Sequence, residues 1–188
     1  MKLLKKATIW AIVIALSVAL AACNHAEEPA NNPSVAEKTI HTDYHMHIQS
    51  KQMADIFIAI LGSDELSGNQ LEESSAETII ELLDEAGMDR AFIISVAYIS
   101  GNDLIAGPDE YNDVKKENNY LAIQCARYPE RLIGFFSVNP LKEYAAEEVD
   151  RCYDELKLPG LKLHFANSNV DLTNPEPLAK IQNLFALC

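Results

Sequence analysis

From residue 39 onward, the chain alternates segments that have the hydrophobic pattern of a strand with segments that have the pattern of a helix. Helical segments repeat apolar residues every three or four positions, whereas strands show a short apolar or alternating run. The predicted strands are Thr39–Ile48, Arg90–Tyr98, Leu132–Val138 and Leu161–Phe165. The predicted helices are Lys51–Leu61, one from the capping-box pair Ser74 and Glu77 to Gly87, Tyr111–Tyr128, Ala145–Leu156, and a last one that begins at Asn174 and Pro175.

This alternation limits the fold to two architectures. The nearly unbroken apolar run Arg90–Tyr98 is typical of a strand buried on both faces, as in parallel sheets. Strands that alternate with helices build either a β/α barrel or a doubly wound sheet. No Gly-x-Gly-x-x-Gly motif follows any strand, which disfavours a dinucleotide-binding sheet. We therefore predict an α/β fold, the N-terminal half of a (β/α)8 TIM barrel, apparently truncated in the helix after the fourth strand.

Residues 1–22 have the three parts of a secretory signal peptide. A lysine-rich start is followed by an apolar run to Ala22, with small residues just before Cys23. The stretch Leu20–Cys23 resembles the lipobox of bacterial lipoproteins, in which the cysteine is acylated and becomes the first residue after cleavage. An uncleaved membrane anchor is the alternative interpretation. Both interpretations place the protein outside the cytoplasm and on a membrane.

Residues 23–38 are polar and interrupted by proline, a composition typical of a flexible tether. This leaves residues 39–188 as the partial barrel domain. We expect an exported protein that is lipid-anchored to the membrane, in the periplasm or on the outer cell surface. Asn24 stands where an inner-membrane retention signal would favour aspartate, so an outer-membrane location is preferred.

The charge of the chain excludes some partners. The whole sequence carries a formal charge of −13, from 15 basic and 28 acidic residues. Removal of residues 1–22 takes away three lysines and no acid, which leaves 12 basic residues against 28 acidic ones and a charge of −16. Such an excess argues against nucleic acid and against electrostatic adhesion to anionic lipid. The expected partners are a small-molecule substrate and, through the lipid on Cys23, the membrane.

The other cysteines show no metal-binding or redox spacing, because the sequence contains no Cys-x-x-Cys motif. Cys125 and Cys152 fall within predicted helices, where a small buried side chain is expected. A disulfide between them is the alternative in an oxidising compartment.

Three of the five histidines fall near predicted strand ends. His45 and His47 are two residues apart, so on a strand both imidazoles project to one face. His164 stands near the end of the fourth predicted strand, and active sites of β/α barrels lie at the carboxyl ends of the strands. Three protein ligands and one open position are typical of catalytic zinc. A pair of surface histidines and a hydrogen-bonded core His164 are the alternatives.

Four segments together resemble the amidohydrolase superfamily, and within it the amidohydrolase-related branch of aminocarboxymuconate-semialdehyde decarboxylase-like enzymes. These segments are Asp43–His47, Phe92–Ala97, Tyr128–Phe135 and Gly160–His164. The resemblance covers about residues 39–188 and implies a TIM barrel of the metal-dependent hydrolase type. It implies that His45, His47 and His164 bind a divalent metal, most often zinc. It also implies a catalytic histidine and a metal-binding aspartate, both of which would lie beyond Cys188.

Two neighbouring residues have more than one interpretation. Lys162 shares a strand face with His164, and some superfamily members carry a carboxylated lysine that bridges two metals; a lysine paired with an acid is the alternative. Asp43 shares the face of His45 and His47 and is expected either to orient a ligand from behind or simply to begin the strand.

The resemblance implies hydrolysis as the leading reaction, in which a metal-activated water attacks the carbonyl of an amide, ester or lactone. Metal-dependent, non-oxidative decarboxylation is the second enzymatic hypothesis. A non-catalytic, membrane-anchored binding lipoprotein is the alternative from another class. Because the expected catalytic groups would lie beyond Cys188, we expect this chain to be weakly active or inactive.

Overall fold

Four parallel strands form one sheet, which confirms the predicted α/β class. They are β1 (Thr42–His47), β2 (Arg90–Ile94), β3 (Leu132–Ser137) and β4 (Gly160–Lys162). In the sheet they follow one another in the order of the sequence, and each pairs in parallel with the next. This order is that of a barrel wall, in which each strand is joined to its neighbour by a crossover connection.

The computed structural model describes residues 39–62 and 72–187, and from Ile40 on these belong to one unit. The predicted signal peptide, the predicted lipidation site Cys23 and the predicted tether lie outside the described residues. Within the described ranges, no helix combines the length and apolar character that crossing a bilayer requires.

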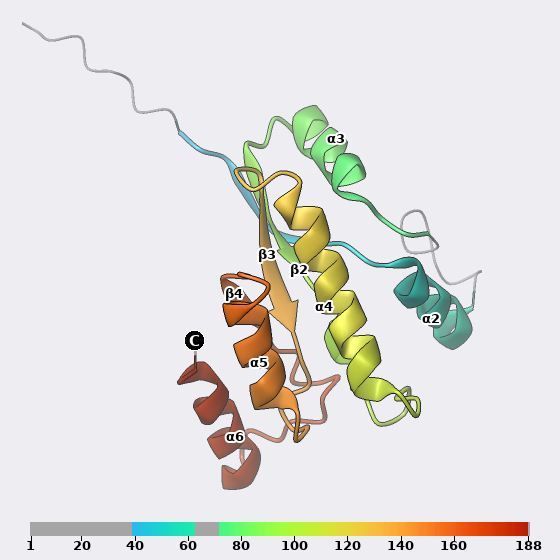
Figure 1. The fold of residues 1–188 in the computed structure, drawn as a ribbon, viewed down its shortest axis with the longest axis vertical. Coiled ribbons are helices and arrows are strands. Elements are labelled where there is room, and N and C mark those ends of the chain that lie inside the picture. The colour runs from blue at the N-terminus through green and yellow to red at the C-terminus, as the bar shows by residue number, and fades with distance from the viewer. Residues whose placement is uncertain (1–38, 63–71, 188) are drawn as a thin grey trace, which may run out of the picture. The chain divides into compact units, whose positions relative to one another are not determined.

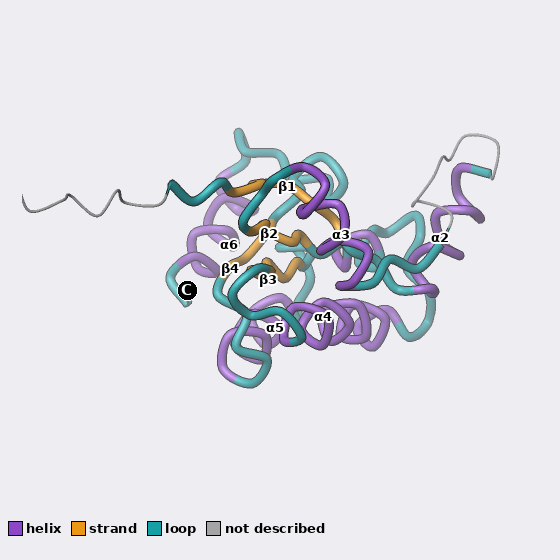
Figure 2. The backbone as a smooth tube through the Cα atoms, turned by 90° about the horizontal axis from the view of Figure 1, so that it is seen from above, coloured by secondary structure: helices purple, strands orange, loops and turns teal. Residues whose placement is uncertain are grey.

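The helices follow the strands much as the sequence predicts (Figure 1). The elements between and after the strands are α2 (Lys51–Leu61), α3 (Ala76–Ala86), the 3₁₀ turn η2 (Ala97–Ile99), α4 (Glu110–Ala126), α5 (Ala145–Asp154) and α6 (Pro175–Phe185). Figures 1 and 2 show α4 and α5 running along one side of the sheet.

The ends of α3 and α6 follow the usual capping chemistry, with one correction. The Asn174 side chain accepts the Glu176 N–H at the start of α6, as the sequence predicts. At α3 the N-cap is Ser75, which accepts the Thr78 N–H, and not Ser74. The Ser74 hydroxyl instead accepts the backbone N–H of Gln49 at 2.9 Å, which ties the segment before α3 to the end of β1. The capping-box spacing therefore located the helix but placed its first residue one position early.

All four predicted strands are too long, the third by only one residue, since β3 ends at Ser137 and not at Val138. The strand predicted for Arg90–Tyr98 ends at Ile94, because the Ser95 hydroxyl accepts the Ala97 N–H and the chain turns into η2. The strand predicted for Leu161–Phe165 ends at Lys162, so His164 lies in the following loop. β1 begins at Thr42 and not at Thr39. At β2 a local polar contact stops the strand where hydrophobicity alone would continue it.

The side of the sheet that faces the helices carries the main hydrophobic core. Ala91 and Ile93 of β2 and Phe136 of β3 are fully buried there. They pack with apolar residues of α3, α4, α5 and α6, which include Ile79, Leu83, Leu121, Val149 and Leu184. Burial of each large side chain in such a core contributes roughly 1.5–3 kcal/mol.

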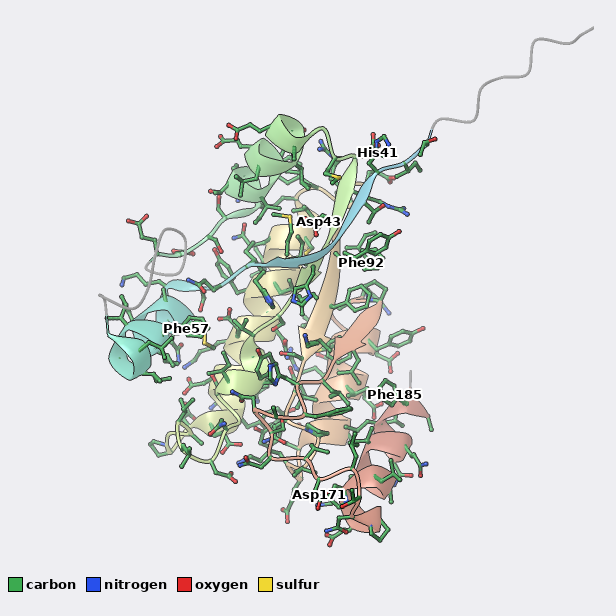
Figure 3. All side chains as sticks on the ribbon, turned by 180° about the vertical axis from the view of Figure 1, so that it is seen from behind. His41, Asp43, Phe57, Phe92, Asp171 and Phe185 are labelled. Atoms are coloured by element: carbon green, nitrogen blue, oxygen red, sulfur yellow. The ribbon has the colours of Figure 1, made fainter. Side chains whose placement is uncertain are left out.

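The opposite side of the sheet carries a row of aromatic rings from three strands. The ring of Tyr44 meets the edge of Phe92 with centroids 5.1 Å apart, and Phe92 stacks on Phe135 at 4.9 Å. Gly160 lets the Phe135 ring approach β4, since a Cβ at that position would come within 2.3 Å of it. Figure 3 shows this side, with the sheet in front of α4. These rings remain half-buried or exposed among the described residues.

Cys125 and Cys152 are buried in the core and are both free thiols, so the alternative of a disulfide between them is not realised. Burial raises the pKa of the Cys125 thiol to about 12. Burial also raises the pKa of Cys152, and the neighbouring Glu148 carboxylate raises it further. Both side chains therefore act as small apolar groups.

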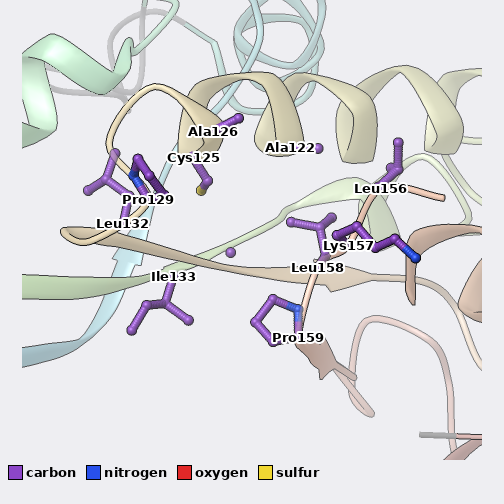
Figure 4. Close-up of a pocket in the computed structure, with 11 residues that line it drawn as sticks. Ala122, Cys125, Ala126, Pro129, Leu132, Ile133, Leu156, Lys157, Leu158 and Pro159 are labelled. Atoms are coloured by element: carbon purple, nitrogen blue, oxygen red, sulfur yellow. The ribbon is translucent and has the colours of Figure 1, made fainter. Parts of the chain in front are cut away.

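A cavity of about 320 Å³ lies beside the first half of β3 (Figure 4). Its lining is mostly apolar and comes from the end of α4, the start of β3 and the segment before β4. Gly134 belongs to this lining, and a Cβ there would come within 2.6 Å of Leu158. None of the predicted site residues lines this cavity.

Candidate metal centre

The two histidines of β1 converge on one point. The Nε2 atoms of His45 and His47 lie 3.0 Å apart, with ring centroids 5.0 Å apart. An irregularity in the pairing of β1 with β2, between Asp43 and Met46, accompanies this arrangement. At this irregularity the Asp43 carboxylate accepts the backbone N–H of His45 at 2.8 Å. Asp43, which is labelled in Figure 3, therefore shapes the strand that carries the pair, through a hydrogen bond to the backbone of His45 and not to an imidazole ring.

The tautomer of His47 is set by the neighbouring strand. Its Nδ1 lies 2.9 Å from the carbonyl oxygen of Ile94, the last residue of β2. A carbonyl oxygen can only accept, so Nδ1 carries the proton and Nε2 presents its lone pair. A metal-binding histidine is usually oriented in this way, by a hydrogen bond from the ring N–H that does not face the metal.

The pKa of His47 is lowered from its usual value. The main cause is that the surrounding groups displace water from part of the ring, although the side chain keeps some contact with solvent. The hydrogen bond to Ile94 opposes this shift, and positive charge on His45, Lys162 and His164 adds to it. A lowered pKa keeps the imidazole neutral at neutral pH, which is the form that binds a metal.

The spacing of the pair fits two positions on one divalent ion. Two imidazole nitrogens bound to a tetrahedral zinc at about 2.0–2.1 Å lie roughly 3.3 Å from each other. The 3.0 Å separation of the two Nε2 atoms is close to this value. The donor set is thus suited to half of a metal site.

His164 is held apart from the pair. Its Nδ1 accepts the backbone N–H of Asn167 at 3.1 Å, and its ring stacks on Tyr98 with centroids 4.9 Å apart. In residues 39–62 and 72–187, no group of three or more His, Cys, Asp or Glu side chains is placed to hold a metal ion. The structure therefore brings together two of the three predicted ligands and leaves the third on the loop after β4.

Sequence reasoning missed a buried polar network that holds the ends of β2 and β3. The Asn118 side chain of α4 accepts the Ser95 hydroxyl at 2.8 Å and the Ser137 N–H at 3.1 Å. Its amide donates to the Ser137 carbonyl at 3.0 Å and to Glu148 at 2.7 Å. Because Ser95 directly follows Ile94, this network fixes the strand end that orients His47.

A second buried carboxylate, that of Glu117, fixes the segment that follows the histidine pair. Glu117, next to Asn118 on α4, accepts the backbone N–H of Ser50 at 3.1 Å and also the Ser50 hydroxyl. Ser50 is the N-cap of α2 and follows His47 by three residues. The only signal in the sequence was a pair of polar residues, Glu117 and Asn118, on the helix face that the apolar pattern places in the core.

Comparison with known proteins identifies the family to which the chain belongs. Residues 42–188 match the amidohydrolase family, and the chain belongs to that family. This match confirms the predicted superfamily and the predicted TIM-barrel type, with part of the barrel present. Members of the superfamily include metal-dependent enzymes.

Solved structures of low sequence identity share the fold. The 5-carboxyvanillate decarboxylase of Novosphingobium aromaticivorans, solved with manganese, is 18% identical with a TM-score of 0.62, over 78% of this chain and 48% of that one. The enzyme of the same name from Sphingomonas paucimobilis is 15% identical with a TM-score of 0.58, over 80% and 50%. A 4-oxalomesaconate hydratase from Rhodopseudomonas palustris is 16% identical with a TM-score of 0.50, over 79% and 50%. The chain thus spans about half the length of these proteins.

Proposed function

We propose that this protein is part of a divalent-metal-dependent enzyme that acts on a small carbonyl or carboxyl compound, with His45 and His47 as metal ligands. The observation that carries the proposal is the 3.0 Å convergence of their Nε2 atoms, one of which is oriented by the Ile94 carbonyl. His164 is proposed as a third ligand, which requires its side chain to move towards the pair, because in the described residues the three histidines do not form one group. Asp43 supports the pair through the backbone of His45.

The leading reaction is hydrolysis of an amide, ester or lactone. A divalent ion at this position would polarise the carbonyl and lower the pKa of a coordinated water. The chain's own contribution is to present His47 as a neutral ligand in a fixed tautomer and to keep both rings on one side of the sheet. The Asn118 network stabilises that arrangement from beneath.

Non-oxidative decarboxylation is the second candidate, and the solved neighbours favour it. Two of the structures with the fold described above are named as decarboxylases of a carboxylated aromatic compound. Zinc remains our expectation for the metal because the two donors are imidazoles. Manganese is the ion found in one neighbour, so both metals belong in the test.

Elemental analysis of the purified chain tests the metal site. We expect His45→Ala and His47→Asn to lose most of the bound zinc or manganese, and His164→Gln to weaken binding less. His41→Ala is the matched control, because His41 is also exposed on the same segment but contacts Asp89. Unchanged metal content in both β1 variants would overturn the ligand assignment.

The reaction is tested separately, with the metal-loaded protein. Release of acid from aryl esters and lactones would support hydrolysis, and release of CO₂ from carboxylated phenols would support decarboxylation. Stoichiometric metal binding with neither activity would favour the non-catalytic binding lipoprotein.

We further propose that Cys23 carries a lipid that anchors the protein to the membrane outside the cytoplasm. The lipobox-like sequence Leu20–Cys23 supports this proposal. Cys23→Ser should release the protein into the soluble fraction of a fractionated cell. Continued membrane retention of this variant would point instead to an uncleaved anchor.

A further inference from the structure

Lys162 lies on the same side of the sheet as the histidine pair. His47 pairs with Ile94, Ile94 with Phe135, and Phe135 with Gly160, and residues paired in this way project to the same side. Lys162 follows Gly160 by two residues, so its side chain projects to that side too, one pleat nearer the carboxyl end. The residues on either side of Lys162 confirm the alternation, because Leu161 and Leu163 pack against the helix-facing core.

Lys162 differs from the other lysines in the described part of the chain. It is half-buried and forms no ion pair or hydrogen bond with any described residue. Lys157 also lacks such a partner, but it is exposed. The others are partnered: Lys51 with Asp55, Lys116 with Asp113, Lys142 with Asp103 and Glu110, Lys115 with the Tyr111 ring, and Lys180 with the Leu141 carbonyl.

No carboxylate of the described residues forms an ion pair with Lys162, although the chain as a whole is strongly acidic. A partly buried ammonium group without a counter-charge is unfavourable. An anionic group bound beside it, and beside a divalent ion, would remove that cost.

We propose that Lys162 forms a carboxylate subsite, in which its ammonium group binds a carboxylate of the substrate on the side of the sheet that carries the His45–His47 pair. This subsite rests on the proposed function, because it assigns the anionic end of a small substrate to the same side of the sheet as the proposed metal. It also replaces the two earlier interpretations of Lys162 as a metal bridge or as the partner of an acid.

The surrounding sequence favours a carboxylate over a phosphate. Phosphate sites usually add arginine forks or the backbone N–H groups of a glycine-rich loop to a lysine. The residues that follow Lys162, from Leu163 to Asn167, contain neither arginine nor glycine. A single compact ammonium group is matched to a single carboxylate.

Calorimetric titration of the full chain with benzoate, in the presence of manganese or zinc, tests the subsite. Benzamide is the uncharged ligand of the same shape. We expect benzoate to bind about tenfold or more tightly than benzamide, as one charged hydrogen bond provides. Lys162→Met should abolish that difference and Lys162→Arg should retain part of it. Lys157→Met, which removes an exposed lysine, should bind benzoate as the wild type does.

Metal content is measured on the same samples, so that the two proposals fail separately. Loss of metal binding with a retained preference for benzoate would overturn the metal site and leave the subsite standing. Equal affinity of the wild type and Lys162→Met for benzoate, with both proteins folded by circular dichroism, would overturn the subsite. Displacement of benzoate by an equal concentration of inorganic phosphate would overturn the carboxylate assignment.

Discussion

The two sides of the sheet are built from alternate residues of the same strands, yet they differ in almost every property. On β3, Phe136 is fully buried against the helices, whereas Phe135 stacks on Phe92 on the opposite, half-buried side. His47, Lys162 and the exposed Tyr44 belong to that opposite side. Core packing and the candidate site therefore lie on opposite sides of the sheet, so substitutions of neighbouring residues such as Phe135 and Phe136 should have separable effects.

The largest expected effect tests the helix-facing side. Phe136→Ala should lower the free energy of unfolding by about 3–5 kcal/mol, because it removes a buried ring and leaves a cavity. Phe92→Ala on the opposite side should cost only about 1–2 kcal/mol, since that ring is half-buried. Urea unfolding followed by circular dichroism measures both. Equal losses of unfolding free energy in the two variants would show that the two sides contribute equally to stability.

The polar network at the strand ends should have the next largest effect. Asn118→Leu leaves the Ser137 carbonyl and Glu148 without their amide donor, and should cost about 2–3 kcal/mol. Because the network fixes the end of β2, the variant should also bind metal more weakly. Asn112→Ala on the same helix, whose side chain contacts the exposed Asp109, is the control and should change stability by less than about 0.5 kcal/mol.

The lowered pKa of His47 predicts a smaller, pH-dependent effect in metal-free protein. The unfolded chain protonates this imidazole first as the pH falls, so the unfolded state binds more protons. Stability should therefore fall as the pH drops below about 6.5, the usual pKa of histidine, towards the lower value in the folded state. Urea unfolding in EDTA between pH 8 and pH 5 measures this slope.

His47→Asn is the matched variant for that measurement. Its side-chain amide can still donate to the Ile94 carbonyl, but it does not titrate in this range. The slope should be shallower in this variant than in the wild type. An identical slope in both proteins would assign the pH dependence to other groups.

Chemical labelling of single side chains compares solvent access on the two sides of the sheet. Cys125, on the helix-facing side, should resist iodoacetamide at pH 8, because burial both shields its thiol and raises its pKa to about 12. The exposed His45 should react readily with diethyl pyrocarbonate. Mass spectrometry of the folded protein and of the protein in urea compares the two. Fast alkylation of Cys125 in the folded state would show that the core opens.

Hydrophobic periodicity was sufficient to predict the order of strands and helices, because the parallel sheet and its helices are held by apolar packing. It failed at the ends of strands. Ser95 ends β2 through contacts with Ala97 and Asn118, and neither contact has a periodic signal. His164 was placed on a strand because Leu161 and Leu163 alternate correctly, although the strand pairing stops at Lys162.

The candidate site was predictable only where its geometry follows from spacing along one strand. His45 and His47 converge because they are two residues apart on β1. The position of His164 could not be predicted, since it depends on stacking with Tyr98, which is distant in sequence. The Lys162 environment was missed for the same reason: that no acid within residues 39–62 and 72–187 pairs with it is a property of the folded chain.

The hydrogen bond between His47 and the Ile94 carbonyl has a consequence for how this site tolerates change. The group that orients this proposed ligand is a main-chain atom, so no substitution at position 94 can delete it directly. The Ile94 side chain is free to vary among apolar residues while the imidazole stays oriented. What must be preserved is the point at which β2 ends, and that point is set by Ser95 and Asn118. Substitutions at those two residues would therefore alter metal affinity without touching a metal ligand.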